Sequence, residues 1–297
     1  MRAALAHQPE PEVVDEVESA SEAIGALLVQ EGHLTQAQLE QVLIAQKRRR
    51  GRFGELAVKL KFVSQQAIDA ALARQFSYHA GLAHQRERLP EVLVSAREPG
   101  TPFAEAMRAL RGQLAQRWFT GSPHERAMAL ASVDPGDGKS FVCANLAVAF
   151  SQLGERTLLI DANLRDPRQH HFFRLRERMG LSGVLAGRAG LSQVRRIQDL
   201  PGLSVLPAGA APPNPQELLA GNAFRRLLTE LSQHFGVILI DTPAAQTASD
   251  VHGVAVRAGA ALLLARKHHT RVPELARLSG DFATAGVNVL GSTMNEY

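Results

Sequence analysis

Cysteine, aromatic residues and long apolar runs are all scarce in this chain of 297 residues. The single cysteine, Cys143, excludes an internal disulfide bond and suits a reducing compartment. Aromatic residues make up only 5% of the chain, and no recognition motif accompanies them, which argues against nucleic-acid binding. No stretch approaches the roughly 18 consecutive apolar residues of a membrane-spanning helix, and the acidic residues 1–22 lack the apolar core of a secretion signal. We therefore expect a cytoplasmic protein that reaches a membrane only through a partner.

Composition and charge divide the chain into segments. Hydrophobic residues make up 45% of the sequence, enough for a sizeable core, and the length fits about two domains. Lys and Arg outnumber Asp and Glu by 33 to 29, and much of the excess lies in the basic run 47–52. Such a run forms a solvated surface or linker, or it contacts anionic lipid or a phosphate ligand. We predict a disordered acidic tail at 1–21, a helical tandem-repeat domain at 22–83, a linker at 84–100 and a second domain at 101–297.

An internal repeat occupies the predicted helical domain. Residues 24–29 and 53–58 carry the same apolar pattern around Gly25 and Gly54, with an offset of 29 residues. Each copy predicts a short helix, a turn, a Thr or Ser cap and an amphipathic helix. The two copies should pack on each other as a small α-helical domain. The offset continues through Thr35/Ser64, Gln36/Gln65, Leu39/Ile68, Glu40/Asp69, Leu43/Leu72 and Gln46/Gln75.

This repeat resembles the N-terminal domain of type II secretion and pilus-assembly ATPases, in some of which a tandem motif binds cyclic di-GMP. In the second copy Arg52 precedes Phe53, as in that motif. In the first copy Ala23 stands where the motif has arginine, and Gly32 corresponds to Lys61 in the second copy. Two functions stay open for this domain: a helical docking module, or a sensor of cyclic di-GMP.

Apolar runs of strand length alternate with helical patterns in the second domain. This alternation is typical of βαβ units. We therefore predict an α/β fold with a doubly wound, mostly parallel sheet, preceded by the small α-helical domain. The apolar runs lie at 127–133, 156–161, 203–207, 236–241, 259–265 and 287–291.

A phosphate-binding loop (P-loop) follows the first of these runs. Its glycines allow the backbone to curl so that N–H groups surround phosphate oxygens, and the N-terminus of the next helix adds partial positive charge. Lys139 should bridge the β- and γ-phosphates, and the Ser140 hydroxyl should bind Mg²⁺. We predict ATP and Mg²⁺ as cofactors. The predicted nucleotide-binding residues are Asp134, Gly136, Asp137, Gly138, Lys139, Ser140 and Phe141.

Two further apolar runs end in aspartates, Asp161 and Asp241. Ligands of doubly wound sheets lie beyond the carboxyl ends of the strands, so both carboxylates should face the phosphates. Asp241 suits a role in holding Mg²⁺ through its water shell. Asp161 is placed to bind the metal directly or to accept a proton from the attacking hydroxyl. The predicted Mg²⁺ site therefore consists of Ser140, Asp161 and Asp241.

Several motifs from about residue 100 to the end match one family. Asp161-Ala-Asn163-Leu-Arg165 fits a second Walker motif of the form Asp-x-Asp-x-Arg, and it continues as Asp166-Pro-Arg-Gln-His170. The segments 180–187 and 206–219 and the helix pattern Glu105-x-x-Arg108-x-x-Arg111 also match. The chain thereby resembles the bacterial tyrosine autokinases that partner chain-length-determinant proteins in exopolysaccharide synthesis and export.

The resemblance implies a function and a set of partners. It implies an ATP-dependent protein-tyrosine autokinase that regulates exopolysaccharide chain length, recruited to the inner membrane by a membrane-embedded chain-length-determinant protein. It implies Lys139, Asp161 and Asn163 as catalytic residues. It also implies a homo-oligomeric ring assembled through Glu105, Arg108 and Arg111.

Partitioning and cell-division ATPases are the main competing family within this fold. They place a signature lysine early in the P-loop, where this chain has Asp134-Pro135-Gly136. No lysine lies between Lys61 and Lys139, so that mechanism is missing and the kinase family is favoured.

Two departures from the kinase family leave alternatives open. Asn163 replaces the second aspartate, which removes a negative charge beside the metal, and the tyrosine-rich tail is absent. The chain has only Tyr78 and Tyr297, and we predict Tyr297 as the acceptor, modified by a neighbouring subunit. A strand ending near Ser292 would leave a tail of about five residues for this reaction. The alternatives are a regulatory pseudokinase and an ATPase switch without tyrosine transfer.

Histidines and arginines near the predicted site invite other interpretations. The pairs His170-His171 and His268-His269 have no Cys or acidic partner at ligand spacing in the sequence, so we expect loop imidazoles near phosphate and no metal site. Arg165 and Arg168 should pair with phosphate, with carboxylates on the Asp241 side, or in surface ion pairs.

Overall fold

The computed structural model describes residues 24–26, 28–29, 32–49, 53–65, 67–68, 88–122, 125–175 and 179–296. The chain forms two compact units, Met1–Leu82 and Ala83–Tyr297, and each is treated by itself below. The predicted tail at 1–21 lies outside the described residues. Among the helices in the described ranges, none combines the length and the apolar composition needed to cross a bilayer.

The N-terminal unit contains the helices α2 (Gln36–Arg49) and α3 (Phe53–Lys59) around a small core. Both copies of the repeat use the same close contact, because a Cβ on Gly25 would overlap Leu39 and a Cβ on Gly54 would overlap Ile68. These contacts are one repeat apart in the sequence. The core residues are Leu28, Leu34, Leu39, Val42, Phe53, Leu56, Ala57 and Ile68.

The caps and turns of the two copies correspond as well. Thr35 Oγ1 accepts a hydrogen bond from the Gln38 amide at 3.3 Å, and Ser64 Oγ accepts one from the Ala67 amide at 3.2 Å. Such caps satisfy N–H groups that the first helical turn leaves free. The turn before each cap uses a left-handed residue, Gly32 with φ 74° and its equivalent Lys61 with φ 59°. Lys61 therefore occupies the conformation that glycine adopts more easily.

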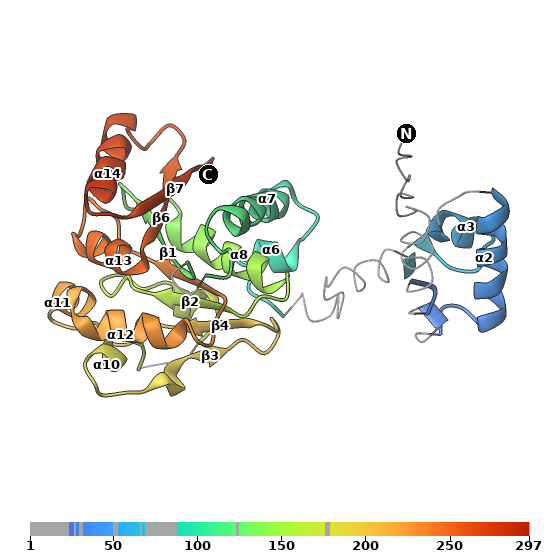
Figure 1. Ribbon diagram of the computed structural model, residues 1–297, viewed down its shortest axis with the longest axis horizontal. Coiled ribbons are helices and arrows are strands. Elements are labelled where there is room, and N and C mark those ends of the chain that lie inside the picture. Colours follow the sequence, from blue (N-terminus) through green and yellow to red (C-terminus); the bar gives the residue numbers. More distant parts are fainter. Residues whose placement is uncertain are drawn as a thin grey trace, which may run out of the picture. The chain divides into compact units, whose positions relative to one another are not determined.

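The second unit is built on a seven-stranded sheet with the order β3-β4-β2-β5-β1-β6-β7 (Figure 1). All neighbouring strands are parallel except β3, which is antiparallel to β4. The predicted doubly wound, mostly parallel sheet is confirmed. The short edge strand β3 was not predicted, because its two arginines carry no apolar signal. The strands are β1 (Ala127–Ser132), β2 (Thr157–Asp161), β3 (Arg195–Arg196), β4 (Leu203–Leu206), β5 (Val237–Asp241), β6 (Ala260–Arg266) and β7 (Asn288–Asn295).

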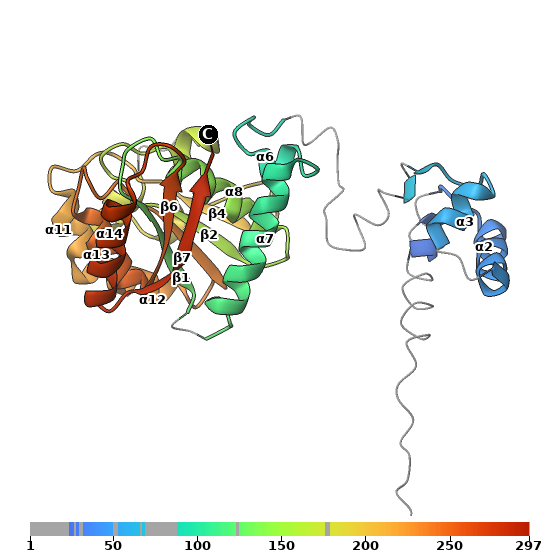
Figure 2. The ribbon, with the colours of Figure 1, turned by 90° about the horizontal axis from the view of Figure 1, so that it is seen from above.

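Helices cover both faces of this sheet (Figures 1 and 2). Successive strand residues point to opposite faces, so Leu130 joins the core under one helical layer while Ala129 and Ala131 join the other. The first layer consists of α6 (Val94–Arg97), α7 (Pro102–Arg117) and α8 (Lys139–Ser151). The second consists of α10 (Leu181–Leu185), α11 (Pro215–Ala220), α12 (Asn222–Leu231), α13 (Asp250–Ala258) and α14 (Val272–Thr284). Two short helical segments, α9 (Gln169–Phe172) and η1 (Leu191–Gln193), complete the unit.

The predicted linker at 84–100 is wrong over residues 88–100. Leu89 and Leu93 are buried in the core of the second unit, at 5% and 1% exposure. The buried Asn145 of α8 fixes this segment, since its Oδ1 accepts from the Ser95 amide and its Nδ2 donates to the Val92 carbonyl, both at 2.8 Å. Leu89, Leu93 and Ala96 are buried at helical spacing. Their packing outweighs the linker signal of the nearby proline and arginine residues.

The last strand extends further than expected. β7 pairs with β6 as far as the register Arg266↔Asn295, with an irregularity near Gly291, whose φ is 137°. The predicted strand end near Ser292 and tail of about five residues are therefore wrong. Glu296 is the one described residue after the strand, and Tyr297 lies outside the described residues. In Figure 2, α7 runs beside β7, where Arg117 donates a hydrogen bond to the Leu290 carbonyl at 3.2 Å.

Candidate functional site

A cavity of about 480 Å³ opens where the P-loop, the end of β2 and the end of β5 meet. Parallel strands bring their carboxyl ends to one edge of the sheet, and the connections that follow β1, β2 and β5 form the walls. Of the predicted site residues, it is lined by Gly136, Gly138, Lys139, Ser140, Phe141 and Asn163. The other lining residues are Pro135, Arg165, Asp166, Arg168, Phe172, Pro243, Ala244 and Thr247.

The P-loop connects β1 to the N-terminus of α8 in a conformation that depends on glycine. Gly136 and Gly138 have φ values of 82° and 93°, which side-chain-bearing residues rarely adopt. Lys139 follows at the first turn of α8 and is 7% exposed, and its Nζ donates a hydrogen bond to Ser132 Oγ at 2.8 Å. Burial lowers the pKa of Lys139, while the charges of Asp241, Asp137 and Asp134 partly oppose this shift.

Asp161 and Asp241 are direct neighbours in the register of β2 and β5, and both are fully buried. Removal from water raises the pKa of Asp161 well above its usual range, and the charge of Asp241 adds to the effect. Burial also raises the pKa of Asp241, against hydrogen bonds from Ser140 and Gln169 and the charge of Lys139. Two carboxylates held together in this way need a cation when both are ionised.

Asp161 is held by the backbone that follows it. Its Oδ1 accepts from the Asn163 amide at 3.2 Å, and its Oδ2 accepts from the amides of Arg168 and Gln169 at 3.0 and 2.9 Å. A carboxylate offers about four acceptor positions, so little capacity remains for another ligand. The side chain therefore shapes the 161–169 loop, which contributes Asn163, Arg165, Asp166 and Arg168 to the cavity wall.

Asp241 is less completely bonded than Asp161. Its Oδ2 accepts from Gln169 Nε2 at 2.8 Å, and the same Nε2 donates to the Ser140 carbonyl at 3.0 Å. Asp241 Oδ1 and Gln169 Oε1 are buried without a hydrogen-bond partner among the described residues. Buried polar atoms of this kind need a partner, and a bound ion or its water shell would provide one. Sequence reasoning missed Gln169, whose only signal was its place in the run 166–170.

Asn163 uses its side chain to close a tight turn. Its Nδ2 donates to the Asp166 carbonyl at 2.7 Å, and its Oδ1 accepts from the Asp166 amide at 3.2 Å. An aspartate at this position would keep the second bond and lose the first. The only carboxylate among the described lining residues is Asp166, whose side chain is 69% exposed and pairs with Arg168 at 2.9 Å.

The arginines and histidines of this region divide between the cavity and other contacts. Arg165 forms a bidentate pair, at 2.8 and 3.2 Å, with the buried Asp250 of α13, the helix that follows β5 and Asp241. The rings of His170 and His171 lie against each other, with centroids 3.9 Å apart and planes tilted by 40°. Partial burial lowers the pKa of His170, and the charges of His171 and Arg168 act in the same direction.

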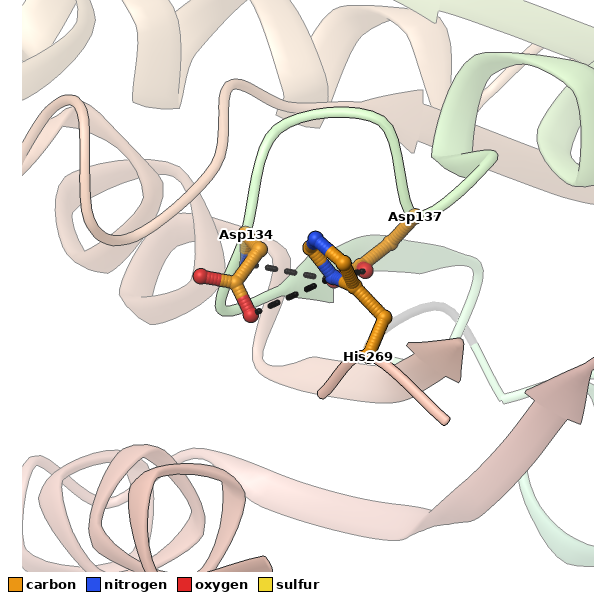
Figure 3. Close-up of side chains that lie close together, drawn as sticks. All are labelled: Asp134, Asp137 and His269. Atoms are coloured by element: carbon orange, nitrogen blue, oxygen red, sulfur yellow. Dashed lines mark hydrogen bonds and ion pairs between the residues drawn. The ribbon is translucent and has the colours of Figure 1, made fainter. Parts of the chain in front are cut away.

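The side chains of Asp134 and Asp137 lie next to His269 (Figure 3), and none of these three residues lines the cavity. His269 Nδ1 is 3.4 Å from Asp137 Oδ1 and 3.8 Å from Asp134 Oδ2. The expectation that this histidine lacks acidic partners is wrong, because its partners are 132 or more positions earlier in the sequence and only the fold brings them near. Neither aspartate lines the cavity, and the predicted nucleotide-binding role of Asp134 and Asp137 stays a prediction.

The predicted oligomerisation residues lie on α7, which Thr101 caps by accepting from the Ala104 amide. Arg108 pairs with Glu105 and donates to the Pro99 carbonyl at 2.8 Å, and Arg111 donates to the Ala149 carbonyl of α8 at 2.9 Å. The Glu105 side chain is 71% exposed, against 17% for Arg108. Glu105 is therefore the member of this set that most fully faces solvent.

A family model and similar known proteins place this chain in the same family. The model for the cellulose biosynthesis protein BcsQ family matches residues 126–275, about half of the chain. The putative tyrosine-protein kinase CapB of Staphylococcus aureus is 32% identical over 200 residues, which make up 67% of this chain and 86% of CapB. The chain belongs to the P-loop family that contains the bacterial tyrosine-protein kinases. The resemblance to the kinase family from about residue 100 onward is thereby confirmed, and the resemblance of the N-terminal repeat stays a prediction.

Other members of the family differ in length and share the fold. The tyrosine-protein kinase ptk of Acinetobacter johnsonii is 35% identical over 192 residues, which make up 65% of this chain but only 26% of ptk. The kinase domain of the Escherichia coli tyrosine kinase Etk superposes with a TM-score of 0.64 and 31% identity, over 68% of this chain and 79% of that domain. The chain thus spans about a quarter of ptk and most of CapB and of the Etk domain.

Proposed function

We propose that the chain binds Mg·ATP in the P-loop cavity and acts as a protein-tyrosine autokinase. Membership of the kinase family supports the reaction class. The observation that carries the proposal is the buried, in-register pair Asp161 and Asp241 beside the P-loop, with Asp241 Oδ1 unpartnered. Two adjacent buried carboxylates are costly for a fold and are retained where a cation is held.

The residues present fit a magnesium nucleotide. The two left-handed glycines curl the backbone, and the N-terminus of α8 follows directly. Lys139 supplies the cation for the phosphates, and Ser140 with Asp241 supplies oxygen ligands for the metal or its water shell. When bound, Mg·ATP supplies the transferable phosphoryl group and a metal ion that offsets phosphate charge.

The chain's own residues position the reaction. When nucleotide binds, the Lys139 ammonium exchanges its hydrogen bond to Ser132 Oγ for a contact with phosphate. Gln169 links Asp241 to the start of α8, because its Nε2 bonds both Asp241 and the Ser140 carbonyl. Asp161 adds negative charge to the metal side of the site and retains room for about one further bond. Asn163 sets the turn that places Asp166 on the cavity wall.

A nucleotide-dependent regulator without efficient transfer is the second candidate, either a pseudokinase or an ATPase switch. Asn163 favours it, because both polar atoms of this side chain serve the turn and bring no charge to the metal. The scarcity of tyrosines also favours it, since only Tyr78 and Tyr297 are present.

An assay with purified full-length chain separates the two candidates. The chain is incubated with Mg·ATP, alone and with the cytoplasmic segment of its membrane partner, and phosphotyrosine is measured by mass spectrometry. Phosphotyrosine that disappears when EDTA removes the metal is the expected result. Nucleotide binding without any transfer under both conditions would support the regulator.

We further propose partners from the family resemblance. A membrane-embedded chain-length-determinant protein would recruit the chain to the inner membrane for exopolysaccharide export, and copies would assemble through Glu105, Arg108 and Arg111. Because Arg108 and Arg111 also bond within the chain, the exposed Glu105 is the side chain to test, by sedimentation of Glu105→Lys. An unchanged sedimentation coefficient would exclude this interface.

For the N-terminal unit we propose a helical docking module, with cyclic di-GMP binding as the alternative. Ile44 and Leu60 are exposed apolar residues of this unit, at 53% and 41%, and apolar exposure suits protein docking. Titration of the full chain with cyclic di-GMP tests the alternative directly. Saturable binding would replace the docking proposal.

A further inference from the structure

Residues that do not line the cavity hold the other side of the P-loop, here called its outer side, and they come from two segments near the end of the sequence. Arg266, at the end of β6, donates to the Gly136 carbonyl at 3.4 Å. Thr270 Oγ1 donates to Asp137 Oδ1 at 3.1 Å. Asn295, the last residue of β7, donates from Nδ2 to the Asp137 carbonyl at 3.0 Å. These contacts reach the loop from 130 or more positions away in the sequence.

The bonds to the two carbonyls determine where the loop amides point. In a planar trans peptide the C=O and the following N–H point in opposite directions. The Asp137 carbonyl shares its peptide with the Gly138 N–H, and the Gly136 carbonyl shares its peptide with the Asp137 N–H. Donors that hold these carbonyls outward therefore hold both N–H groups toward the cavity side. Amides in this orientation are the ones that bind phosphate oxygens.

The fit between Asn295 and the loop is close. A Cβ on Gly138 would overlap the Asn295 amide, so glycine at this position permits the contact as well as the left-handed turn. The Asn295 backbone is itself fixed, because its carbonyl accepts from the Lys267 amide at 2.8 Å. Lys267 Nζ also pairs with Glu296 at 3.1 Å, so the bond network continues to the residue after Asn295.

We propose that Asn295 is a positioning residue for nucleotide binding, and that the end of β7 and the phosphate affinity of the P-loop are thereby coupled. The proposal rests on the proposed nucleotide binding and names its regulation. Tyr297, the predicted acceptor, lies two positions beyond Asn295 in the sequence. Coupling between two binding events is reciprocal. If nucleotide binding disfavours movement of this end into another subunit's site, that movement weakens the chain's own nucleotide binding by the same factor.

Calorimetric titration of the full chain with Mg·ADP tests the proposal, because ADP binding requires no phosphoryl transfer. Asn295→Ala removes one net hydrogen bond to the loop, and we expect affinity about fivefold weaker than wild type. Asn288→Ala, at the exposed start of the same strand, is the matched control and should change affinity by less than about twofold. Equal affinities for Asn295→Ala and Asn288→Ala would overturn the proposal.

A second measurement uses the wild-type chain and needs no variant. If the end of β7 and nucleotide binding are coupled, hydrogen exchange of the amides in 290–296 slows when Mg·ADP is bound. Unchanged exchange in this segment, with ADP bound, would overturn the coupling while leaving the proposed function intact. Failure of the wild-type chain to bind Mg·ADP would instead contradict the proposed function itself.

Discussion

The two sides of the P-loop are organised on different principles. On the cavity side, Lys139, Ser140 and the strand-end Asp241 belong to motifs that are visible in the sequence. On the outer side, Arg266, Thr270 and Asn295 come from the last two strands and the segment after β6, without any local motif. The local motif therefore supplies the groups that contact phosphate, whereas distant residues fix the orientation of the peptide planes that carry the loop N–H groups.

The buried acids on the two sides differ in the same way. Asp137 is fully buried on the outer side, yet it accepts from the Asp134 amide and from Thr270 and lies beside His269. Asp241 on the cavity side keeps one oxygen without a partner among the described residues. The outer acid completes the loop structure, and the inner acid is left for a ligand.

The largest effect should come from the cavity side. Lys139→Ala removes the only lysine of the cavity wall among the described lining residues, and a charge-assisted contact to phosphate is worth about 10- to 150-fold in affinity. Calorimetry with Mg·ADP measures the loss. Lys59→Ala, an exposed lysine of α3 in the N-terminal unit, is the control and should bind almost as wild type. Unchanged affinity in Lys139→Ala would remove the P-loop assignment.

An intermediate effect, on stability more than on affinity, should come from the outer side. Thr270→Val keeps the shape of the side chain but removes the donor to Asp137 and the acceptor for the Arg266 amide. Leaving a buried acceptor short of a bond costs about 1–3 kcal/mol, so the free energy of unfolding should fall by this order. Chemical denaturation measures it, with the exposed Thr229→Val as control. If Thr270→Val is as stable as wild type, the outer contacts do not hold the loop.

The smallest effect is expected at Asn163. Asn163→Asp restores the second carboxylate of the family motif, and it loses the donor to the Asp166 carbonyl. We expect metal-dependent phosphoryl transfer to rise a few-fold because added negative charge strengthens metal binding, while the turn keeps its bond from the Asp166 amide. Initial rates at several Mg²⁺ concentrations measure the balance. A flat or lower rate would show that the hydrogen bond from the Asn163 side chain to the Asp166 carbonyl matters more to the site than the added charge.

The sequence predicted the elements whose signal is local. Six apolar runs became strands close to their expected positions, and Asp161 and Asp241 lie side by side because parallel strands share one carboxyl edge. The P-loop followed from its glycines and lysine. Each of these predictions depends on residues that are neighbours in the chain or on the periodicity of one element.

The remaining features depend on tertiary contacts and could not be predicted. Leu89 and Leu93 looked like part of a linker, and only the fold buries them and brings Asn145 of α8 to the backbone of Val92 and Ser95. His269 lacked acidic partners until the fold placed Asp134 and Asp137 beside it. Asn295 carried no signal at all, since an asparagine at the end of an edge strand is ordinary unless its neighbour in space is known.

Phosphopeptide mapping shows whether the chain transfers phosphate from Mg·ATP to a tyrosine. The wild-type chain and Tyr297→Phe are incubated with Mg·ATP and the cytoplasmic segment of the membrane partner, and both tyrosine-containing peptides are quantified. We expect phosphate on Tyr297 in the wild type, none in Tyr297→Phe, and transfer to the neighbouring copy in mixtures of active and Lys139→Ala chains. Phosphate on Tyr78 alone, or on neither tyrosine, would contradict the kinase and leave a nucleotide-binding regulator.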